Sequence, residues 1–365
     1  MINKLILSNV LYRPIRTVLS ALAVAMEVAM VMLFVGLAHG LVNDSAQRQE
    51  GVGADVMVQP SGSPFLLAFS QSPMPLSIGG RLEQVPHVLA VAPTLILFNT
   101  GALSMVYGID MDSFKRVSGG FAYHSGGSFT KPYDLLVDDL YAKSKHIKVG
   151  QTVDLLNHQF TVCGIVEHGK GARLFIPLPT AEDLLQVKDR ATIFWVKCTE
   201  PAYTDKVVAA VRQLLPQCQV TPVKEWMSLM TSNNLPGLNV FTTVIITIAV
   251  GIGFLVIFLS MYTTITERTR EIGILKSLGA SKGYIIAVIL REAGLLSAVG
   301  ILAGYGVALV TRKLILANFP TLVIELTLLW AVYAAVLAIA GSLLGAFYPA
   351  MRAAQLDPVD ALAYE

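Results

Sequence analysis

Long apolar runs and polar stretches alternate along this chain. Four of the runs cover residues 17–42, 240–265, 284–310 and 322–347. Each run is long enough to cross a membrane as a helix, because about 20 residues rising about 1.5 Å each span the hydrocarbon core. The pattern predicts four transmembrane helices.

Residues 43–238 follow a different pattern. Gly, Pro, Ser and charged residues separate short runs rich in β-branched and aromatic residues, which is typical of strands and turns. The predicted strands are 54–60, 89–98, 103–110, 151–156, 160–166, 173–178 and 191–198, and helical patterns cover 111–117, 137–145, 180–186 and 203–215. This mixture predicts a compact α+β domain, of one or two lobes, inserted between the first two membrane helices. The predicted domains are 1–42, 43–238 and 239–365.

The composition agrees with a membrane protein. Of the 365 residues, 54% are hydrophobic, more than in an ordinary soluble domain. The net charge of +2, without a basic run, gives no indication of nucleic-acid binding. Cys163, Cys198 and Cys218 are too few and too widely spaced for a disulfide framework or a zinc site. A Cys198–Cys218 bridge and three separate packed thiols both stay open.

Basic residues predict which side of the membrane each loop faces. The first run is preceded by Lys4, Arg13 and Arg16, and the stretch between the second and third runs holds Arg268, Arg270, Lys276 and Lys282. By the positive-inside rule, both regions are cytoplasmic, although Arg312 and Lys313 oppose the trend. The α+β domain then lies outside the cytoplasm, and both termini lie inside.

The two ends of the chain predict short helices. Residues 1–16 suit a helix in the cytoplasmic interface or a frayed extension of the first span. The first apolar run is longer than the core of a secretory signal, so we expect it to stay in the membrane. After Pro349 we expect the chain to re-enter the cytoplasm, with Asp357 capping a helix that starts at Pro358.

The polar stretch between the second and third runs reads ERTREIGILKSLGASKG, residues 267–283. Ile272, Leu275 and Leu278 recur at three-residue spacing, which predicts one face of a short helix. Arg268 and Glu271 are spaced to pair on it, and Gly279 is placed to end it. Such an amphipathic helix is either a docking element or a merely solvated loop.

ERTREIGILKSLGAS resembles the cytoplasmic loop of the MacB/FtsX-like permeases, the membrane subunits of ABC transporters. So do the opening NVLYRPIRTVLSALAVA (9–25), the ending PAMRAAQLDPVDAL (349–362) and the order VYGID, LLVDDLYAKSKHIKVGQTVDL, FTVCGIV in the inserted domain. In that family the loop forms a coupling helix that seats in a groove of the ATPase subunit. The resemblance therefore implies coupling residues, which here are Glu267, Arg268, Arg270, Glu271, Ile272, Leu275, Leu278 and Gly279.

GIVEHGK, residues 164–170, has the spacing of a phosphate-binding loop. The next residue is Gly171 rather than the Ser or Thr that binds Mg²⁺, and a strand is predicted where that loop needs a helix. We interpret the segment as a β-hairpin turn. The chain is thus not expected to be an enzyme, and ATP and Mg²⁺ are expected on a separate ATPase subunit.

Glu27 lies near the middle of the first apolar run, where a carboxylate costs on the order of 3 kcal/mol and is a candidate functional group. Met26 adjoins it and Met30 follows one turn later. A carboxylate beside thioethers can bind a haem iron or a soft metal, and haem-exporting permeases are among the compact members that the chain resembles in size. The alternative is a protonated Glu27 hydrogen-bonded inside the bundle, with Met30 as ordinary packing.

The resemblance implies a multi-pass subunit in the bacterial inner membrane, working as a dimer, a homodimer by expectation. ATP-driven closure of the ATPase would move the 267–283 helix, and the spans would carry that motion outward. The cargo stays open among haem, a lipoprotein, a drug and a peptide, as does a periplasmic adaptor. The alternative is a signalling or scaffold subunit that regulates an extracytoplasmic enzyme and transports nothing.

Overall fold

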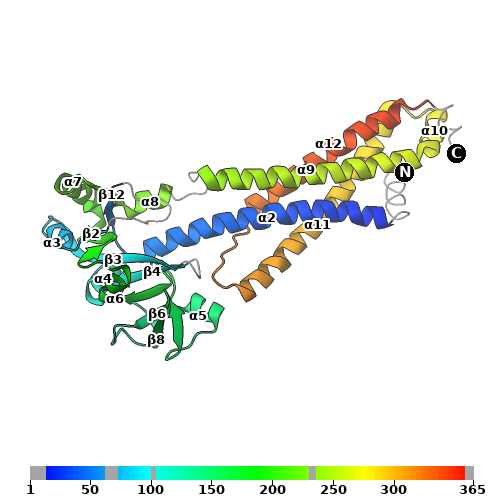
Figure 1. The fold of residues 1–365 in the computed structure, drawn as a ribbon. Helices are drawn as coiled ribbons and strands as arrows, with labels where there is room; N and C mark the ends of the chain where they lie inside the picture. The colour runs from blue at the N-terminus through cyan, green and yellow to red at the C-terminus, as the bar shows by residue number, and fades with distance from the viewer. Residues whose placement is uncertain (1–13, 62–72, 100–103, 230–235, 358–365) are drawn as a thin grey trace. The chain divides into compact units, whose positions relative to one another are not determined.

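A computed structural model describes residues 14–61, 73–99, 104–229 and 236–357. Among these residues, four helices are long and apolar enough to cross a membrane (Figure 1): α2 (Pro14–Gly51), α9 (Pro236–Glu267), α11 (Lys282–Asn318) and α12 (Leu328–Gln355). The chain divides into two compact units. One comprises Met1–Gly40, Pro236–Ala317 and Ile324–Glu365, and the other comprises Leu41–Leu235 and Asn318–Val323. The predicted boundaries at residues 42 and 238 stay predictions.

The last membrane helix differs from its predicted bounds. α12 begins at Leu328 and continues through Pro349 to Gln355, whereas the apolar run covers residues 322–347. Proline removes one backbone donor, but membrane helices tolerate it where neighbours hold the helix. Ala346, Ala350 and Ala353 are fully buried on both sides of Pro349, so packing maintains α12 beyond the apolar run. Similarly, Arg312 lies within α11 rather than in a loop, and its Nε donates to the Ile324 carbonyl at 3.0 Å.

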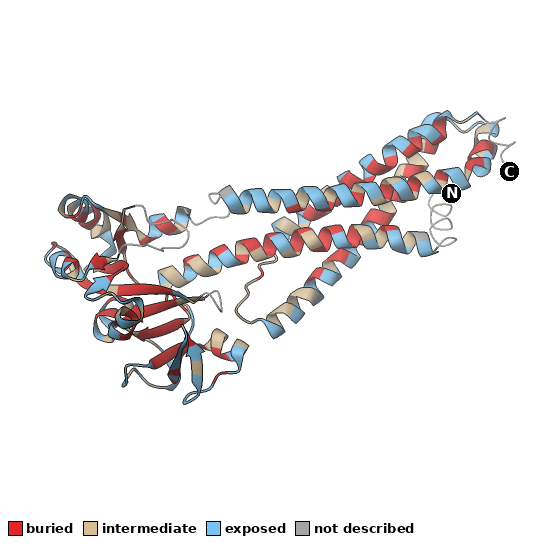
Figure 2. Cartoon of the chain, in the orientation of Figure 1, coloured by how far each residue is buried: buried red, intermediate tan, exposed pale blue. Residues whose placement is uncertain are grey.

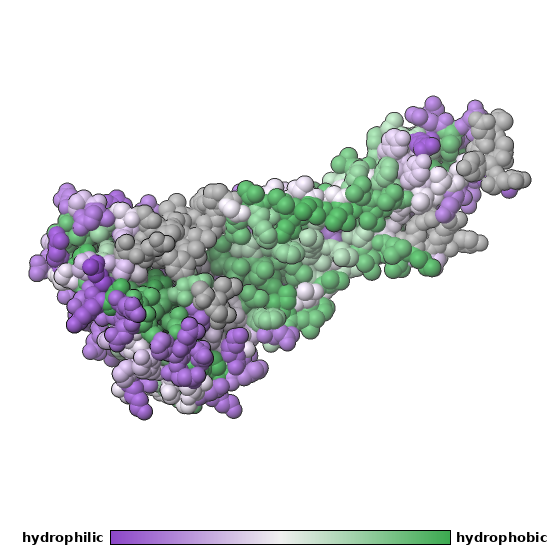
Figure 3. All heavy atoms as spheres, in the orientation of Figure 1, coloured by the Kyte–Doolittle hydropathy of each residue, from purple (hydrophilic) through white to green (hydrophobic). Residues whose placement is uncertain are grey.

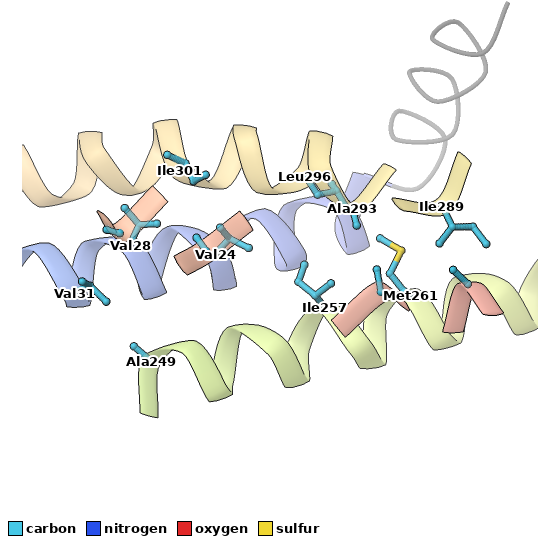
Figure 4. Packing of buried hydrophobic residues seen from close by; sticks show 14 of the residues in the cluster. Val24, Val28, Val31, Ala249, Ile257, Met261, Ile289, Ala293, Leu296 and Ile301 are labelled. Atoms are coloured by element: carbon cyan, nitrogen blue, oxygen red, sulfur yellow. The ribbon is translucent and has the colours of Figure 1, made fainter. Parts of the chain in front are cut away.

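Small and β-branched side chains form the interior of the helix bundle. Figure 4 shows Val24 and Val28 of α2 near Leu296 and Ile301 of α11, with Ile257 of α9 in the same cluster. α2 and α11 approach so closely that a Cβ added at Gly300 would lie 2.6 Å from the Val24 Cβ. A side chain at position 300 would therefore push these helices apart, as expected for small residues at membrane-helix contacts. The outer surface of the helices is hydrophobic in the view of Figure 3.

The second unit is built on a mixed sheet of ten strands. They are β1 (Val56–Pro60), β3 (Val88–Asn99), β4 (Ser104–Ile109), β5 (Tyr123–Gly126), β6 (Asp134–Asp138), β7 (Thr152–Leu155), β8 (His158–Val166), β9 (Leu174–Pro177), β11 (Ile193–Cys198) and β12 (Cys218–Pro222). Their spatial order is β12-β1-β11-β3-β4-β9-β6-β8-β5, and β7 pairs with β8. β4 and β9 are parallel, as are β6 and β8. β2 (Met74–Pro75) and β10 (Arg190–Ala191) form a separate pair.

Short helices cover this sheet, whose strands are mostly buried (Figure 2). They are α3 (Ser77–Glu83), α4 (Met111–Ser118), α5 (Asp139–Lys145), α6 (Leu178–Leu185), α7 (Thr204–Leu214), α8 (Val223–Leu229) and the 3₁₀ turn Pro201–Tyr203. Carboxylates cap two of them: Asp110 accepts from the Ser113 N–H at 3.0 Å, and Asp138 from the Tyr141 N–H at 2.6 Å. Among the described residues of this unit, one hydrophobic cluster forms around Phe194 and another around Phe160.

The seven predicted strands are confirmed as β1, β3, β4, β7, β8, β9 and β11, and the four predicted helices as α4, α5, α6 and α7. α5 begins two residues later than predicted, because Val137 and Asp138 belong to β6. The strands β2, β5, β6, β10 and β12 and the helices α3 and α8 are not among the predicted elements. Cys163, Cys198 and Cys218 are all free thiols.

The segment after β8 is not the predicted hairpin turn. β6 lies between β8 and β9 in the sheet, so residues 167–173 cross over β6 instead of joining neighbouring strands. The strand predicted after the segment is confirmed as β9. The helices predicted at residues 1–16 and from Pro358 fall largely or wholly outside the described residues.

Candidate functional site

A short helix, α10 (Thr269–Ser277), connects α9 to α11. At its end, the N–H of Gly279 donates to the Lys276 carbonyl and the N–H of Ala280 to the Leu275 carbonyl, each at 3.0 Å. This pair of bonds requires a left-handed residue, and Gly279 has φ of 93°. The predicted helix and its glycine end are therefore confirmed.

The inner side of α10 is fixed to α11 through Arg268. The Arg268 Nε donates to Glu271 Oε2 at 2.7 Å, which is the predicted pair. Its Nη1 also lies 3.6 Å from Oε2 of Glu292, a nearly buried residue of α11. Ile272 is buried, and it lines the same small pocket as Arg268 and Glu292. A charge pair that is largely removed from water resists separation, because either partner alone would be left poorly solvated.

The other end of α10 is fixed to α12 through Lys276. The Lys276 Nζ donates to the Ala354 carbonyl at 3.0 Å and also to the Leu356 carbonyl. The last carbonyls of a helix lack partners within it and carry partial negative charge, so an ammonium group satisfies them well. α10 is thus bonded to two membrane helices. This role of Lys276 was not predicted, because the sequence alone identified it only as a positive charge.

The outer side of α10 is apolar at two positions. Ile274 is 44% exposed and Leu278 is 80% exposed, while Ile272 is buried and Leu275 is half-buried. The prediction of a single face with Ile272, Leu275 and Leu278 is therefore wrong. The spacing of four between Ile274 and Leu278, which also defines one side of a helix, could have identified Ile274. The exposed charged residues on or next to α10 are Glu267, Arg270 and Glu271.

Glu27 lies inside the bundle, where only 4% of it is exposed. A Cβ added at Gly253 of α9 would lie 1.9 Å from Glu27 Oε2, and one at Gly341 of α12 would lie 3.9 Å from Oε1. Gly253 therefore leaves the space that the carboxyl group occupies. Within the described parts of the chain, neither oxygen of Glu27 has a hydrogen-bond partner.

The two methionines do not share this position. Met26 is 65% exposed on the bundle surface, so it faces away from Glu27, and Met30 is half-buried against the hydrophobic cluster. The expected set of a carboxylate flanked by two thioethers is not formed. No group of three or more His, Cys, Asp or Glu side chains suited to a metal ion occurs in the described residues.

Comparison with known families identifies both parts of the chain. A family model described as MacB-like periplasmic core domain matches residues 17–214, and one described as FtsX-like permease C-terminal matches residues 243–358. This chain belongs to the MacB/FtsX-like ABC transporter permeases. The resemblance seen in the sequence is confirmed, and so is the fold class: four membrane helices with an inserted extracytoplasmic α+β domain.

Individual relatives of this permease agree with the family. It is 27% identical over 387 residues to the macrolide export ATP-binding/permease protein MacB of Sodalis glossinidius, covering 96% of the chain and 58% of the relative. It is 24% identical over 398 residues to the MacB of Chlorobium phaeobacteroides, covering 98% and 60%. It is 39% identical over 132 residues to an uncharacterized ABC transporter permease, YknZ of Bacillus subtilis, covering 34% and 32%. The permease thus spans three fifths or less of these relatives' lengths.

Two solved structures are similar to part of the permease. One is the periplasmic region of MacB from Actinobacillus actinomycetemcomitans, with a TM-score of 0.37 and 18% identity over 48% of this chain and 92% of that one. The other is the extracellular domain of YknZ, with a TM-score of 0.34 and 12% identity over 46% of this chain and 98% of that one.

Proposed function

We propose that this permease couples ATP hydrolysis on a separate ATPase subunit to movement of its extracytoplasmic domain, and that this movement drives export. The observation that carries the proposal is α10, which is bonded to α11 through Arg268 and to α12 through Lys276 while Ile274 and Leu278 face outward. A partner that pushes on those two side chains would move both membrane helices. Exposed apolar side chains beside charged ones are typical of a protein-binding surface.

We assign ATP binding to the partner rather than to this chain. The two MacB relatives are named ATP-binding/permease proteins. In this chain the segment with phosphate-loop spacing is followed by Gly171 and β9, so it has neither the Mg²⁺-binding hydroxyl nor the helix N-terminus. α10 then lies in the cytoplasm, where the ATPase would bind, and both termini lie on the same side.

The cargo proposal is a hydrophobic compound, such as haem, a lipoprotein, a drug or a peptide, and the two MacB relatives are named for macrolide export. Glu27 favours transport over pure signalling, because a buried carboxyl group without a partner in the described chain is suited to meeting a cargo group. The outward position of Met26 argues against haem as the cargo, because its side chain faces away from Glu27. We further propose a second copy of the permease as a partner, and an adaptor outside the membrane stays open.

The docking role of α10 is tested by Ile274→Asp. A buried aspartate would weaken ATPase binding by about 1.4–2.8 kcal/mol, or roughly 10- to 100-fold, if Ile274 inserts into a groove of the partner. The wild-type permease is purified with its ATPase, which is identified by mass spectrometry, and the affinity is measured in nanodiscs. The matched control is Leu185→Asp on α6, since Leu185 is 43% exposed and Ile274 is 44% exposed.

Equal loss of affinity in both variants would mean that the effect is not specific to α10. Unchanged affinity in Ile274→Asp, with correct membrane insertion, would refute docking through this helix. If no ABC ATPase accompanies the wild-type permease, the coupling proposal itself fails.

A further inference from the structure

The crossover at residues 167–173 holds the end of α2 within the second unit. The N–H of Gly171 donates to the Arg48 carbonyl at 2.7 Å. Gly51 lies so close to the Gly169 carbonyl oxygen that a Cβ at position 51 would be 1.8 Å from it. The last turns of α2 (residues 44–51) therefore pack against the segment that resembles a phosphate loop in sequence. The missing side chain of Gly51 is what permits this contact with the Gly169 backbone.

Arg173, at the end of this crossover, bonds to three different parts of the chain. Its Nη1 donates to Oδ2 of Asp138 at 3.0 Å, at the end of β6. Its Nη2 donates to Oδ2 of Asp44 on α2 at 3.1 Å and to the carbonyl of Thr321 at 3.2 Å, in the segment that follows α11. Guanidinium is suited to this role because its planar group directs several donors at once.

The burial of these groups makes the contacts hard to replace. The side chain of Arg173 is 11% exposed and that of Asp138 only 1%. Burial raises the pKa of Asp138, although the neighbouring Arg173 opposes the shift. Loss of the guanidinium would leave Asp138 buried without its counter-charge, and breaking a buried pair in this way is strongly unfavourable. Asp44 would keep a second partner, since its Oδ2 also lies 3.1 Å from Arg48 Nε.

We propose that Arg173 is a positioning residue that fastens the extracytoplasmic sheet to the two chain segments continuous with α2 and α11. α2 is one uninterrupted helix from Pro14 to Gly51, and the segment 318–323 begins at the last residue of α11, Asn318. A displacement of either membrane helix along its axis would reach Arg173 through Asp44 or Thr321, and the sheet through Asp138. This inference extends the proposed function, and the role of the contact in coupling rests on that function. The contact of Arg173 with the two segments does not itself require the ATPase.

The fastening is tested by hydrogen exchange on the full chain in nanodiscs, without an ATPase. In Arg173→Met, amide exchange in residues 41–51 and 318–323 should rise by about tenfold, because each segment loses a charge-assisted bond that opposes local opening. Asp44→Asn should raise exchange in 41–51 and leave 318–323 nearly unchanged, since Thr321 keeps its bond to Arg173. The matched control is Arg116→Met, which removes an exposed pair with Glu83 at 3.5 Å.

A rise confined to residues 134–145 in Arg173→Met would overturn the proposal, because Arg173 would then serve the sheet alone. If Arg173→Met does not fold, Asp44→Asn decides, and unchanged exchange in 41–51 overturns the proposal.

A further readout separates positioning from mere stability. In the complex with its ATPase, Asp44→Asn should keep the wild-type thermal midpoint and ATPase rate while losing at least half of the ATP-dependent change in exchange of residues 134–145. A full ATP-dependent change in that variant would also contradict the proposal. Loss of ATPase docking at α10 would leave the exchange results without ATPase unaffected, so the two proposals fail separately.

Discussion

At the scale of single residues, Glu27 is the residue of the membrane helices that most needs an explanation. A carboxyl group in the middle of a span costs on the order of 3 kcal/mol on the insertion scale. It lies beside Gly253 and Gly341, which together leave room for it, and no described residue bonds to its oxygens. A side chain retained at this cost has either a partner from outside the described chain or a role as a neutral, space-filling group.

Glu27→Gln separates these two roles, because glutamine has nearly the same shape without the ionisable group. If Glu27 contacts cargo, ATP-dependent uptake into inverted vesicles should fall at least tenfold for whichever candidate cargo the wild-type complex transports. Expression and basal ATPase activity should stay unchanged. Glu182→Gln on the extracytoplasmic domain is the matched control. Wild-type uptake by the Glu27→Gln variant would eliminate a role for the charge and favour the space-filling role.

At the scale of elements, α10 shows which features a sequence can predict. The helix, its Arg268–Glu271 pair and its Gly279 end all depend on residues within four positions of one another, and all three are confirmed. Its outward side was predicted incorrectly, because that side depends on α11 and α12. The bond from Lys276 to Leu356 joins residues 80 positions apart, and no local pattern indicates it.

The same distinction holds in the extracytoplasmic domain. Strands with a long apolar run, such as β3 and β8, were predicted within two residues. β5 was missed because all four of its residues are exposed, so it has no alternating pattern. β6 was missed because its last residue, Asp138, also caps α5, which extended the apparent helix backwards. The crossover at residues 167–173 could not be predicted, because it depends on β6 lying between β8 and β9.

The sides of the membrane on which β5 and α10 lie are predicted from charge and can be measured. Ser125 on β5 and Ser281 after α10 are both exposed. A cysteine at position 125 should react with an impermeant maleimide in intact cells, and one at 281 only after permeabilisation. The background from native cysteines should be low, since burial raises the pKa of all three thiols and that of Cys163 to about 12. Reaction of position 281 in intact cells would invert the proposed topology.

At the scale of the whole molecule, the proposed mechanism depends on a continuous chain of bonds. α10 is held to α11 and α12, and the segments continuous with α2 and α11 are held to the sheet by Arg173. α2 itself is helical over 38 residues, from Pro14 to Gly51. The family relationship establishes that the chain is a permease, and these bonds suggest how a signal at α10 could reach the sheet.

The most direct test is whether ATP on the partner changes the extracytoplasmic domain. The wild-type permease and its ATPase are reconstituted in nanodiscs, and hydrogen exchange is compared with ADP and with ATP in a hydrolysis-deficient ATPase. We predict a reproducible difference in residues 134–145 and 318–323, which is absent when the permease carries Ile274→Asp. An unchanged domain in the ATP-bound complex, with the ATPase firmly bound, would contradict coupling through this chain.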